Sequence, residues 1–416
     1  MNILKFFTAG SVDDGKSTLI GRLLYDTDSI LADQLEALQS SNRKNDDGTI
    51  DLAILTDGLR AEREQGITID VAYKYFQTDK RKFIIADTPG HIQYTRNMVT
   101  GASTANLAII LIDARNGVVE QTIRHSYLVS LLGIKHIVVC INKMDMVDYS
   151  ETVFSAITEK YKALASQLNL KDVTYIPVSA LKGDNIVQTS DKMLWYSGES
   201  LLHFLEKVDT DAQDQSALAR MPVQWVIRPQ TEALHDYRGY AGRVLSGTFK
   251  LNDEVTVFPS GARSTVEKIE ILDQNLEAAH AGQSVVIHLK DDVDISRGDT
   301  IVNATAVPQE SKMIEADLCW MDTRALDPSL TYFLQHNSKI TRTKISEILH
   351  KVDINTLEKH PADAFNLNDI GRVVIKTADA LAFDLYNENR TNGSAILIDS
   401  RTNLTVGALM FRAIAD

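Results

Sequence analysis

The sequence predicts an α/β domain followed by two small antiparallel β-barrel domains. In the first half, apolar runs typical of buried parallel strands, such as Leu107–Ile112 and His136–Ile141, alternate with segments of helical periodicity. From Met221 onward this alternation stops, and short strand-like segments follow one another between glycine-containing turns. The expected domains cover residues 1–210, 221–306 and 311–416.

The composition is that of a folded protein with several domains. A chain of 416 residues exceeds one typical core, and its 44% hydrophobic and 24% charged residues are ordinary values. The net charge of −13 disfavours a nucleic-acid binder, which needs a surplus of lysine and arginine. No apolar stretch approaches the ~18–20 residues that span a membrane. The two cysteines, Cys140 and Cys319, lie in apolar strand-like runs, which fits a reducing cytoplasm, so we expect a cytoplasmic protein without nucleic-acid or membrane partners.

A glycine-rich turn lies between the first strand-like run, which ends at Ala9, and a helical pattern that begins near Lys16. Its glycines let successive N–H groups point into one concavity, at the positive end of the helix. This G-x-x-x-x-G-K-S pattern predicts a P-loop, in which Lys16 reaches the β- and γ-phosphates and Ser17 ligates Mg²⁺. The alternative is a strand-to-helix turn with a solvated lysine. The candidate phosphate-binding residues here are Gly10, Ser11, Val12, Asp13, Asp14, Gly15, Lys16, Ser17 and Thr18.

Two further segments carry residues that could bind a nucleoside triphosphate and its metal ion. Thr68 stands in a Gly-Ile-Thr-Ile stretch, and next to a P-loop it is a candidate second hydroxyl on Mg²⁺. Asp87 follows a buried strand and can hold Mg²⁺ through water, while Gly90 can bring its N–H close to the γ-phosphate. His91 could orient the attacking water. Taken singly, these residues could be turn, capping or surface residues, but their combination favours a functional site.

A third set of residues predicts selection of the base. Asp145 follows Asn142 and Lys143 at the end of an apolar strand, and its carboxylate can accept both the N1–H and the N2–H₂ of guanine. The stem of Lys143 can pack on the ring, and Asn142 can brace the loops. Adenine lacks this pair of donors, so the motif predicts GTP rather than ATP. Backbone N–H groups of Ser179, Ala180 and Leu181 could meet the guanine O6; the alternative for both motifs is an ordinary polar loop.

Five motifs in this order resemble the translational family of GTPases: the P-loop, Gly-Ile-Thr, Asp-Thr-Pro-Gly-His, Asn-Lys-Met-Asp and Ser-Ala. Ser11 and Asp14 depart from the elongation-factor form of the loop, which usually carries histidine after the first glycine and histidine or serine before the second. With these residues, the stretch Gly10–Tyr25 is most similar to the GTPase subunits of bacterial ATP sulfurylase, as is Asp236–Gly242.

The resemblance implies an α/β P-loop GTPase domain followed by the two barrels, with GTP and Mg²⁺ as ligands. It implies that Lys16, Thr68 and His91 are catalytic, and that Val12 and Ile67 screen the histidine. The implied Mg²⁺ ligands are Ser17, Thr68 and, through water, Asp87.

The resemblance also implies a regulatory subunit that couples GTP hydrolysis to the reaction of ATP and sulfate to adenosine 5′-phosphosulfate and diphosphate. The chain shows no Ser-Gly-Gly-Lys-Asp-Ser-type loop of ATP pyrophosphatases. ATP and sulfate are therefore expected on a smaller catalytic subunit of that type, within a hetero-oligomer. The alternative is a translation elongation factor that delivers aminoacyl-tRNA, against which Ser11 and Asp14 argue.

Two features of the second half are expected to lie at surfaces. Lys339–Lys344 is a modest basic cluster, for which a solvated edge strand is the expectation and a docking surface for a partner the alternative. Arg238, on a loop with neighbouring glycines, is a candidate for contact between domains or with a partner.

Replacement of the candidate water-orienting histidine gives the first test. His91→Ala is expected to slow GTP hydrolysis by ~10²–10⁴, the usual contribution of a positioned acid–base group. GTP binding, measured by calorimetry on the same variant, should stay intact because this side chain acts on water. An unchanged hydrolysis rate would remove His91 from the mechanism.

Overall fold

The computed structural model describes residues 3–30, 52, 70–90, 94–209, 218–229, 237–272 and 274–415. The chain divides into two compact units, Met1–Thr210 with Ile354–Thr356, and Asp211–Asp353 with Leu357–Asp416. Among the residues described, no helix combines the length and apolar character needed to cross a membrane. Thr68, His91 and Ile67 lie outside the described residues.

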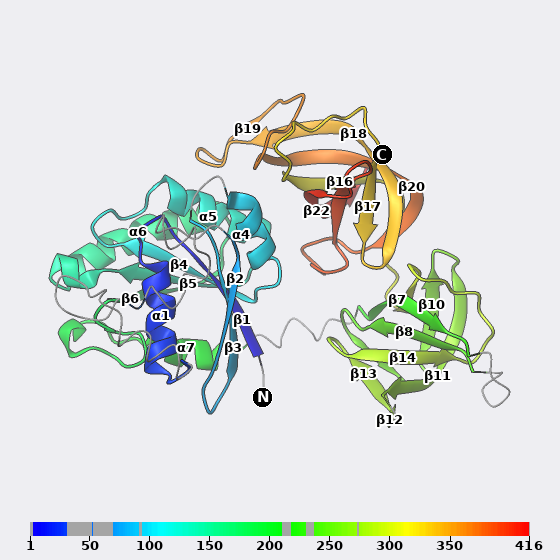
Figure 1. Cartoon of the computed structure of the whole chain (residues 1–416), viewed down its shortest axis with the longest axis horizontal. Coiled ribbons are helices and arrows are strands. Elements are labelled where there is room, and N and C mark those ends of the chain that lie inside the picture. Colours follow the sequence, from blue (N-terminus) through cyan, green and yellow to red (C-terminus); the bar gives the residue numbers. More distant parts are fainter. Residues whose placement is uncertain are drawn as a thin grey trace. The chain divides into compact units, whose positions relative to one another are not determined.

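The first unit contains a six-stranded sheet in the order β2-β3-β1-β4-β5-β6. Only β2 runs antiparallel to its neighbour, and β3, β1, β4, β5 and β6 are parallel (Figure 1). Its strands are β1 (Ile3–Ala9), β2 (Ala72–Gln77), β3 (Lys82–Asp87), β4 (Leu107–Asp113), β5 (His136–Asn142) and β6 (Asp172–Pro177). The helices are α1 (Lys16–Asp26), α4 (Thr95–Ala102), α5 (Glu120–Leu131), α6 (Glu151–Gln167) and α7 (Leu201–Lys207).

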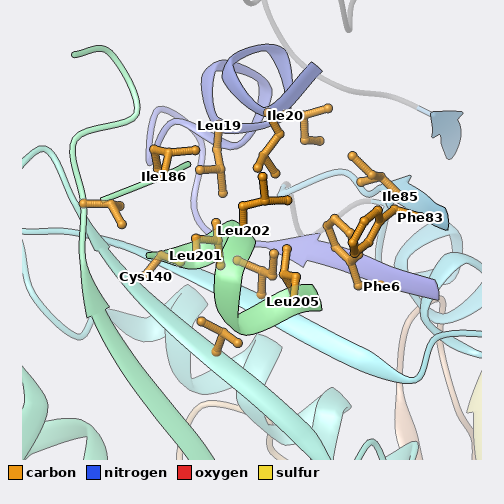
Figure 2. Packing of buried hydrophobic residues seen from close by; sticks show 14 of the residues in the cluster. Phe6, Leu19, Ile20, Phe83, Ile85, Cys140, Ile186, Leu201, Leu202 and Leu205 are labelled. Carbon is orange, nitrogen blue, oxygen red and sulfur yellow. The ribbon is translucent and has the colours of Figure 1, made fainter. Parts of the chain in front are cut away.

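One hydrophobic core fixes the first strand and its following helix. Leu19 and Ile20 of α1 and Leu205 of α7 belong to one buried cluster with Phe6 of β1 (Figure 2). Every residue of β4 is buried, as expected for a parallel strand covered on both faces. This packing holds the turn between β1 and α1 at the carboxyl edge of the sheet, where ligands bind in open α/β folds.

The register brings the predicted polar residues to that same edge. Thr8 of β1 pairs with Asp87 of β3, and Asp113 of β4 pairs with Asn142 of β5. Because these strands are parallel, their carboxyl ends lie side by side, and residues far apart in the sequence become neighbours.

The second unit contains two antiparallel barrels. In the first, pairing of β10 with β11 closes the sheet β10-β15-β7-β8-β14-β11-β12 into a ring to which β12 is attached, and β13 pairs with β9. Its strands are β7 (Arg220–Ile227), β8 (Gly239–Arg243), β9 (Thr248–Lys250), β10 (Glu254–Phe258), β11 (Ala262–Ile271), β12 (Gln274–Leu276), β13 (Ala278–His280), β14 (Ser284–Leu289) and β15 (Thr300–Asn303).

The second barrel closes in the same way. Pairing of β17 with β18 closes the sheet β17-β21-β22-β16-β20-β18-β19. Its strands are β16 (Gln309–Trp320), β17 (Tyr332–His336), β18 (Lys339–Val352), β19 (Lys359–His360), β20 (Ile370–Phe383), β21 (Ser394–Asp399) and β22 (Thr405–Ile414). The predicted fold class, an α/β domain followed by two antiparallel barrels, is therefore confirmed.

The edge-strand expectation for Lys339–Lys344 holds for only part of the segment. Among the described strands, Lys339–Arg342 pair with β17 alone, and pairing with β20 begins at Thr343. These residues begin β18, which pairs with β17 on one side and β20 on the other. The alternation of charged and buried residues marks a strand with one solvated face, and that pattern is the same for an edge strand and an interior strand of a barrel. Arg238 contacts residues of its own barrel, pairing with Asp292 and donating to the Val293 carbonyl oxygen at 3.4 Å.

A buried ion pair joins the two barrels. Arg220 of β7 is fully buried and donates from Nε and Nη2 to the carboxylate of Asp384, at 3.0 and 2.8 Å. The side-chain amides of Asn389 and Asn392 donate to the same carboxylate at 3.2 and 2.9 Å. Asp384 follows β20, so this network ties the second barrel to the first strand of the first barrel.

Removal of the carboxylate charge is expected to destabilise the second unit. Asp384→Asn leaves the guanidinium of Arg220 buried without a counter-ion, which costs ~3–5 kcal/mol in comparable buried pairs. Urea-induced unfolding should show this loss. Glu358→Gln, which breaks an exposed pair with His360, is the control and should change stability by about 0.5 kcal/mol or less. Equal effects of the two variants would contradict a structural role for the buried pair.

Candidate functional site

The P-loop lies between β1 and α1, and its backbone turns sharply at Gly15. Gly15 has φ +94°, and a Cβ at this position would lie 2.4 Å from Nδ2 of Asn142. Both the left-handed backbone and the close approach therefore require glycine. Earlier in the loop, the Ser11 N–H donates to a carboxylate oxygen of Asp14 at 2.5 Å. The loop's first turn is thus closed by one of its own side chains.

The amino group of Lys16 lies inside this loop. Lys16 is buried, and its Nζ donates to the carbonyl oxygens of Gly10 and Ser11, each at 2.9 Å. Burial lowers the pKa of Lys16, while the nearby carboxylates of Asp87, Asp14 and Asp13 oppose this shift. The loop therefore holds the amino group of Lys16 where phosphate oxygens would meet it.

The predicted residues of β3 and its following turn come to the same place. Asp87 is 1% exposed, and its carboxylate accepts a hydrogen bond from the Thr8 hydroxyl at 3.2 Å. A Cβ at Gly90 would lie 2.6 Å from Nζ of Lys16 and 2.5 Å from the Gly10 carbonyl oxygen. Gly90 thus lets the second turn approach the P-loop directly.

The donor set at this place suits a hard cation. Ser17 stands in the first turn of α1, and the Asp87 carboxylate lies near Lys16. In the described part of the chain, no group of three or more His, Cys, Asp or Glu side chains could hold a metal by itself. Mg²⁺ commonly takes one or two protein oxygens, with substrate phosphates and waters completing its shell. The residues present therefore fit Mg²⁺ better than a metal held by protein ligands alone.

Asn142 bridges the P-loop to a second loop. Its side-chain Nδ2 donates to the Asp14 carbonyl oxygen at 2.7 Å, and its Oδ1 accepts from the Ala180 N–H at 2.9 Å. Asn142 is 2% exposed, so both bonds form away from bulk water. These two contacts join the P-loop to the loop after β6.

The same second loop orients the predicted base-reading carboxylate. The Ser179 hydroxyl donates to Oδ1 of Asp145 at 2.6 Å and accepts from the Lys182 N–H at 3.2 Å. Arg22 of α1 also holds this loop, because its Nη2 donates to the Leu181 carbonyl oxygen at 2.5 Å. Ser179 and Leu181 therefore lie in a fixed loop beside a half-buried carboxylate.

Two contacts at this site were not anticipated from the sequence. Asp113 forms an ion pair with Lys143, with Nζ 3.0 Å from Oδ2, and Gln121 of α5 pairs with the Ser11 hydroxyl. The carboxylate at the end of the apolar run Leu107–Ile112 was a detectable signal for Asp113, because polar residues at the carboxyl ends of parallel strands meet. Gln121 could not be found in this way, because it lies within helix α5 and does not end a strand.

Comparisons with known proteins find similar domains and similar whole chains. Residues 1–227 match the model of the elongation factor Tu GTP binding domain, and residues 313–412 match the GTP-eEF1A C-terminal domain-like family. Sulfate adenylyltransferase subunit 1 from Aliarcobacter butzleri is 51% identical over 99% of this chain and 87% of its own. The subunit of the same name from Cellvibrio japonicus is 52% identical over 98% and 86%. Among solved structures, Sup35 complexed with GDP is 22% identical, with a TM-score of 0.46 over 100% of this chain and 95% of its own.

The Asn142 bridge can be tested through backbone protection. Asn142→Ala removes the acceptor of the Ala180 N–H, and loss of a buried hydrogen bond costs ~1–3 kcal/mol. Hydrogen exchange of the Ala180 amide should therefore accelerate by about tenfold or more. Asn116→Ala, at an exposed side chain, is the matched control and should leave this amide unchanged. Unchanged protection in Asn142→Ala would show that the bridge does not hold the loop.

Proposed function

The chain belongs to the sulfate adenylyltransferase subunit 1 family and carries a GTP-binding domain of the elongation factor Tu type, and from this premise we propose that it couples GTP hydrolysis to adenylyl transfer from ATP to sulfate. The observation that carries the GTP part of the proposal is the Asp145 carboxylate, held by Ser179 beside the Asn142 bridge. The sulfate part is supported by the relatives, which match nearly the whole chain and are named as one subunit of a larger enzyme.

The base is read by the carboxylate and the lysine stem. The Asp145 carboxylate accepts from N1–H and N2–H₂ of guanine, and the hydrogen bond from Ser179 fixes its orientation before the ligand arrives. The aliphatic part of Lys143 packs on the ring. Adenine offers no matching pair of donors, so ATP would leave the remaining acceptor sites of a half-buried carboxylate without donors, which costs free energy.

The phosphates are bound by the P-loop N–H groups and Lys16. Ser17, Thr68 and, through water, Asp87 would hold Mg²⁺, which neutralises negative charge on the phosphate oxygens. Gly90 brings its N–H toward the terminal phosphate. This role is supported by the close approach of its backbone to the P-loop, where a Cβ would lie 2.6 Å from Nζ of Lys16. His91 orients the attacking water, with Val12 and Ile67 as its apolar screen.

Coupling requires a partner that carries the ATP and sulfate chemistry. The chain contains no ATP pyrophosphatase loop, so we assign that chemistry to a smaller subunit of a hetero-oligomer. The sulfate–phosphate anhydride is unfavourable to form, and hydrolysis of GTP can draw the reaction forward. Thr68 and its flanking residues would be ordered by the terminal phosphate and released on its loss, which gives the partner two states to distinguish. Both cysteines are buried and unpaired, which supports a cytoplasmic location.

Asp145→Asn tests the reading of the base. The variant replaces a charged acceptor by an amide and should weaken GTP binding by about 10²–10⁴, the value of two charge-assisted hydrogen bonds. Xanthosine triphosphate, which has a carbonyl in place of the 2-amino group, should bind the variant better than GTP does. Asp148→Asn, at an exposed residue three positions further on, is the control and should bind GTP normally. Equal affinities of the unaltered protein for ATP and GTP by calorimetry would overturn the proposal.

The coupled reaction is tested with the copurifying partner subunit. Pyrophosphate release from ATP and sulfate should rise when GTP is added and should not rise with a non-hydrolysable GTP analogue. Turnover that does not depend on GTP would leave coupling without support. Copurification of tRNA in place of a protein subunit would favour an elongation factor.

A further inference from the structure

The loop after β4 holds a buried carboxylate beside the proposed base pocket. Asp113 is the last residue of β4, lies opposite Asn142 in the register and is 2% exposed. The loop that follows is tied to β5, because the Ala114 N–H donates to the Asn142 carbonyl oxygen at 2.8 Å. This carboxylate therefore has a fixed position with respect to the residues that follow Asn142.

Both oxygens of this carboxylate are engaged. Arg115 donates from Nε to Oδ1 at 3.0 Å and from Nη2 to Oδ2 at 2.6 Å, and its backbone N–H donates to Oδ1 at 2.9 Å. The ammonium of Lys143 lies 3.0 Å from Oδ2. Burial alone would raise the pKa of Asp113, but the hydrogen bonds from Arg115 and Lys143 outweigh burial and lower the pKa to about 2. The carboxylate is thus charged at neutral pH.

Lys143 needs such an anchor if its stem is to form a wall of the pocket. Its backbone has φ +61°, and its side chain is 25% exposed. A four-carbon side chain at a partly open position samples many rotamers, and ordering it when a ligand binds costs entropy. An ion pair at the far end of the stem limits these rotamers before the base arrives, which is preorganisation.

From this geometry we infer that Asp113 is a positioning residue for nucleotide retention, because it holds the Lys143 stem where guanine packs and is itself held by Arg115. The inference rests on the proposed reading of guanine by Lys143 and Asp145. Loss of Asp113 speeds nucleotide release through its effect on Lys143, and leaves the association rate and the P-loop contacts unchanged.

The test is a double-mutant cycle on release of fluorescently labelled GDP from the full chain. Asp113→Asn and Lys143→Met should each speed release by about tenfold, with association unchanged. If Asp113 acts through Lys143, the double variant should release GDP no more than about twofold faster than Lys143→Met alone. Release from Asp113→Asn within twofold of the unaltered protein would overturn the inference, and so would multiplied effects in the double variant.

Two further variants serve as a control for general effects of substitution and as a replacement should Asp113→Asn not fold. Asp172→Asn, which breaks the surface pair with His136 at the amino ends of β5 and β6, is the matched control and should release GDP normally. Should Asp113→Asn fail to fold by circular dichroism, Arg115→Gln frees the same carboxylate from a side chain that is 44% exposed. Release from it should be about threefold faster, and an unchanged rate would contradict the inference. Failure of the unaltered protein to bind GDP or GTP would instead contradict the proposed function.

Discussion

The side-chain amide of Asn142 is the contact on which the nucleotide site depends. Its Nδ2 and Oδ1 join the P-loop after β1 to the loop after β6, which are 128 and 38 residues away in the chain. An amide can do this because it carries a donor and an acceptor on one rigid group. The proposed phosphate-binding and base-binding halves therefore share one buried residue, and a shift of either half would break one of its hydrogen bonds.

The parts of the site that local spacing encodes could be predicted from the sequence. Gly10, Gly15 and Lys16 lie within seven residues, so strand, turn and helix chemistry alone specify the P-loop. Asn142 and Asp145 follow the same logic at the end of β5. The Lys143–Asp113 pair could not be predicted with equal force, because it depends on which strands are neighbours, and the order β4-β5 is a property of the whole sheet.

The difference between local signals and long-range strand pairing also explains which features of the barrels could be predicted. Short strands between turns predicted their class, because alternation and turn residues are local signals. The pairs β10–β11 and β17–β18 are hairpins of consecutive strands, but the pairs β10–β15 and β18–β20 join residues far apart in the sequence. The sequence therefore did not show that the strand that begins at Lys339 continues into the interior of the barrel sheet. The ion pair between Arg220 and Asp384 joins residues that are 164 positions apart. The sequence indicates it only through two charged residues in otherwise apolar surroundings.

An acidic residue inside a phosphate-binding loop needs a physical explanation, since it adds negative charge where anions bind. The Asp14 carboxylate points back into the loop and accepts the Ser11 N–H, which neutralises part of its charge locally. Burial raises the pKa of Asp14 and outweighs that hydrogen bond and the nearby amino group of Lys16, which lower it, so the loop compensates the carboxylate only in part. Lys16 also faces Asp87 and Asp13, which places several carboxylates around one lysine. The divalent cation proposed above, bound with the phosphates, would relieve this excess of negative charge.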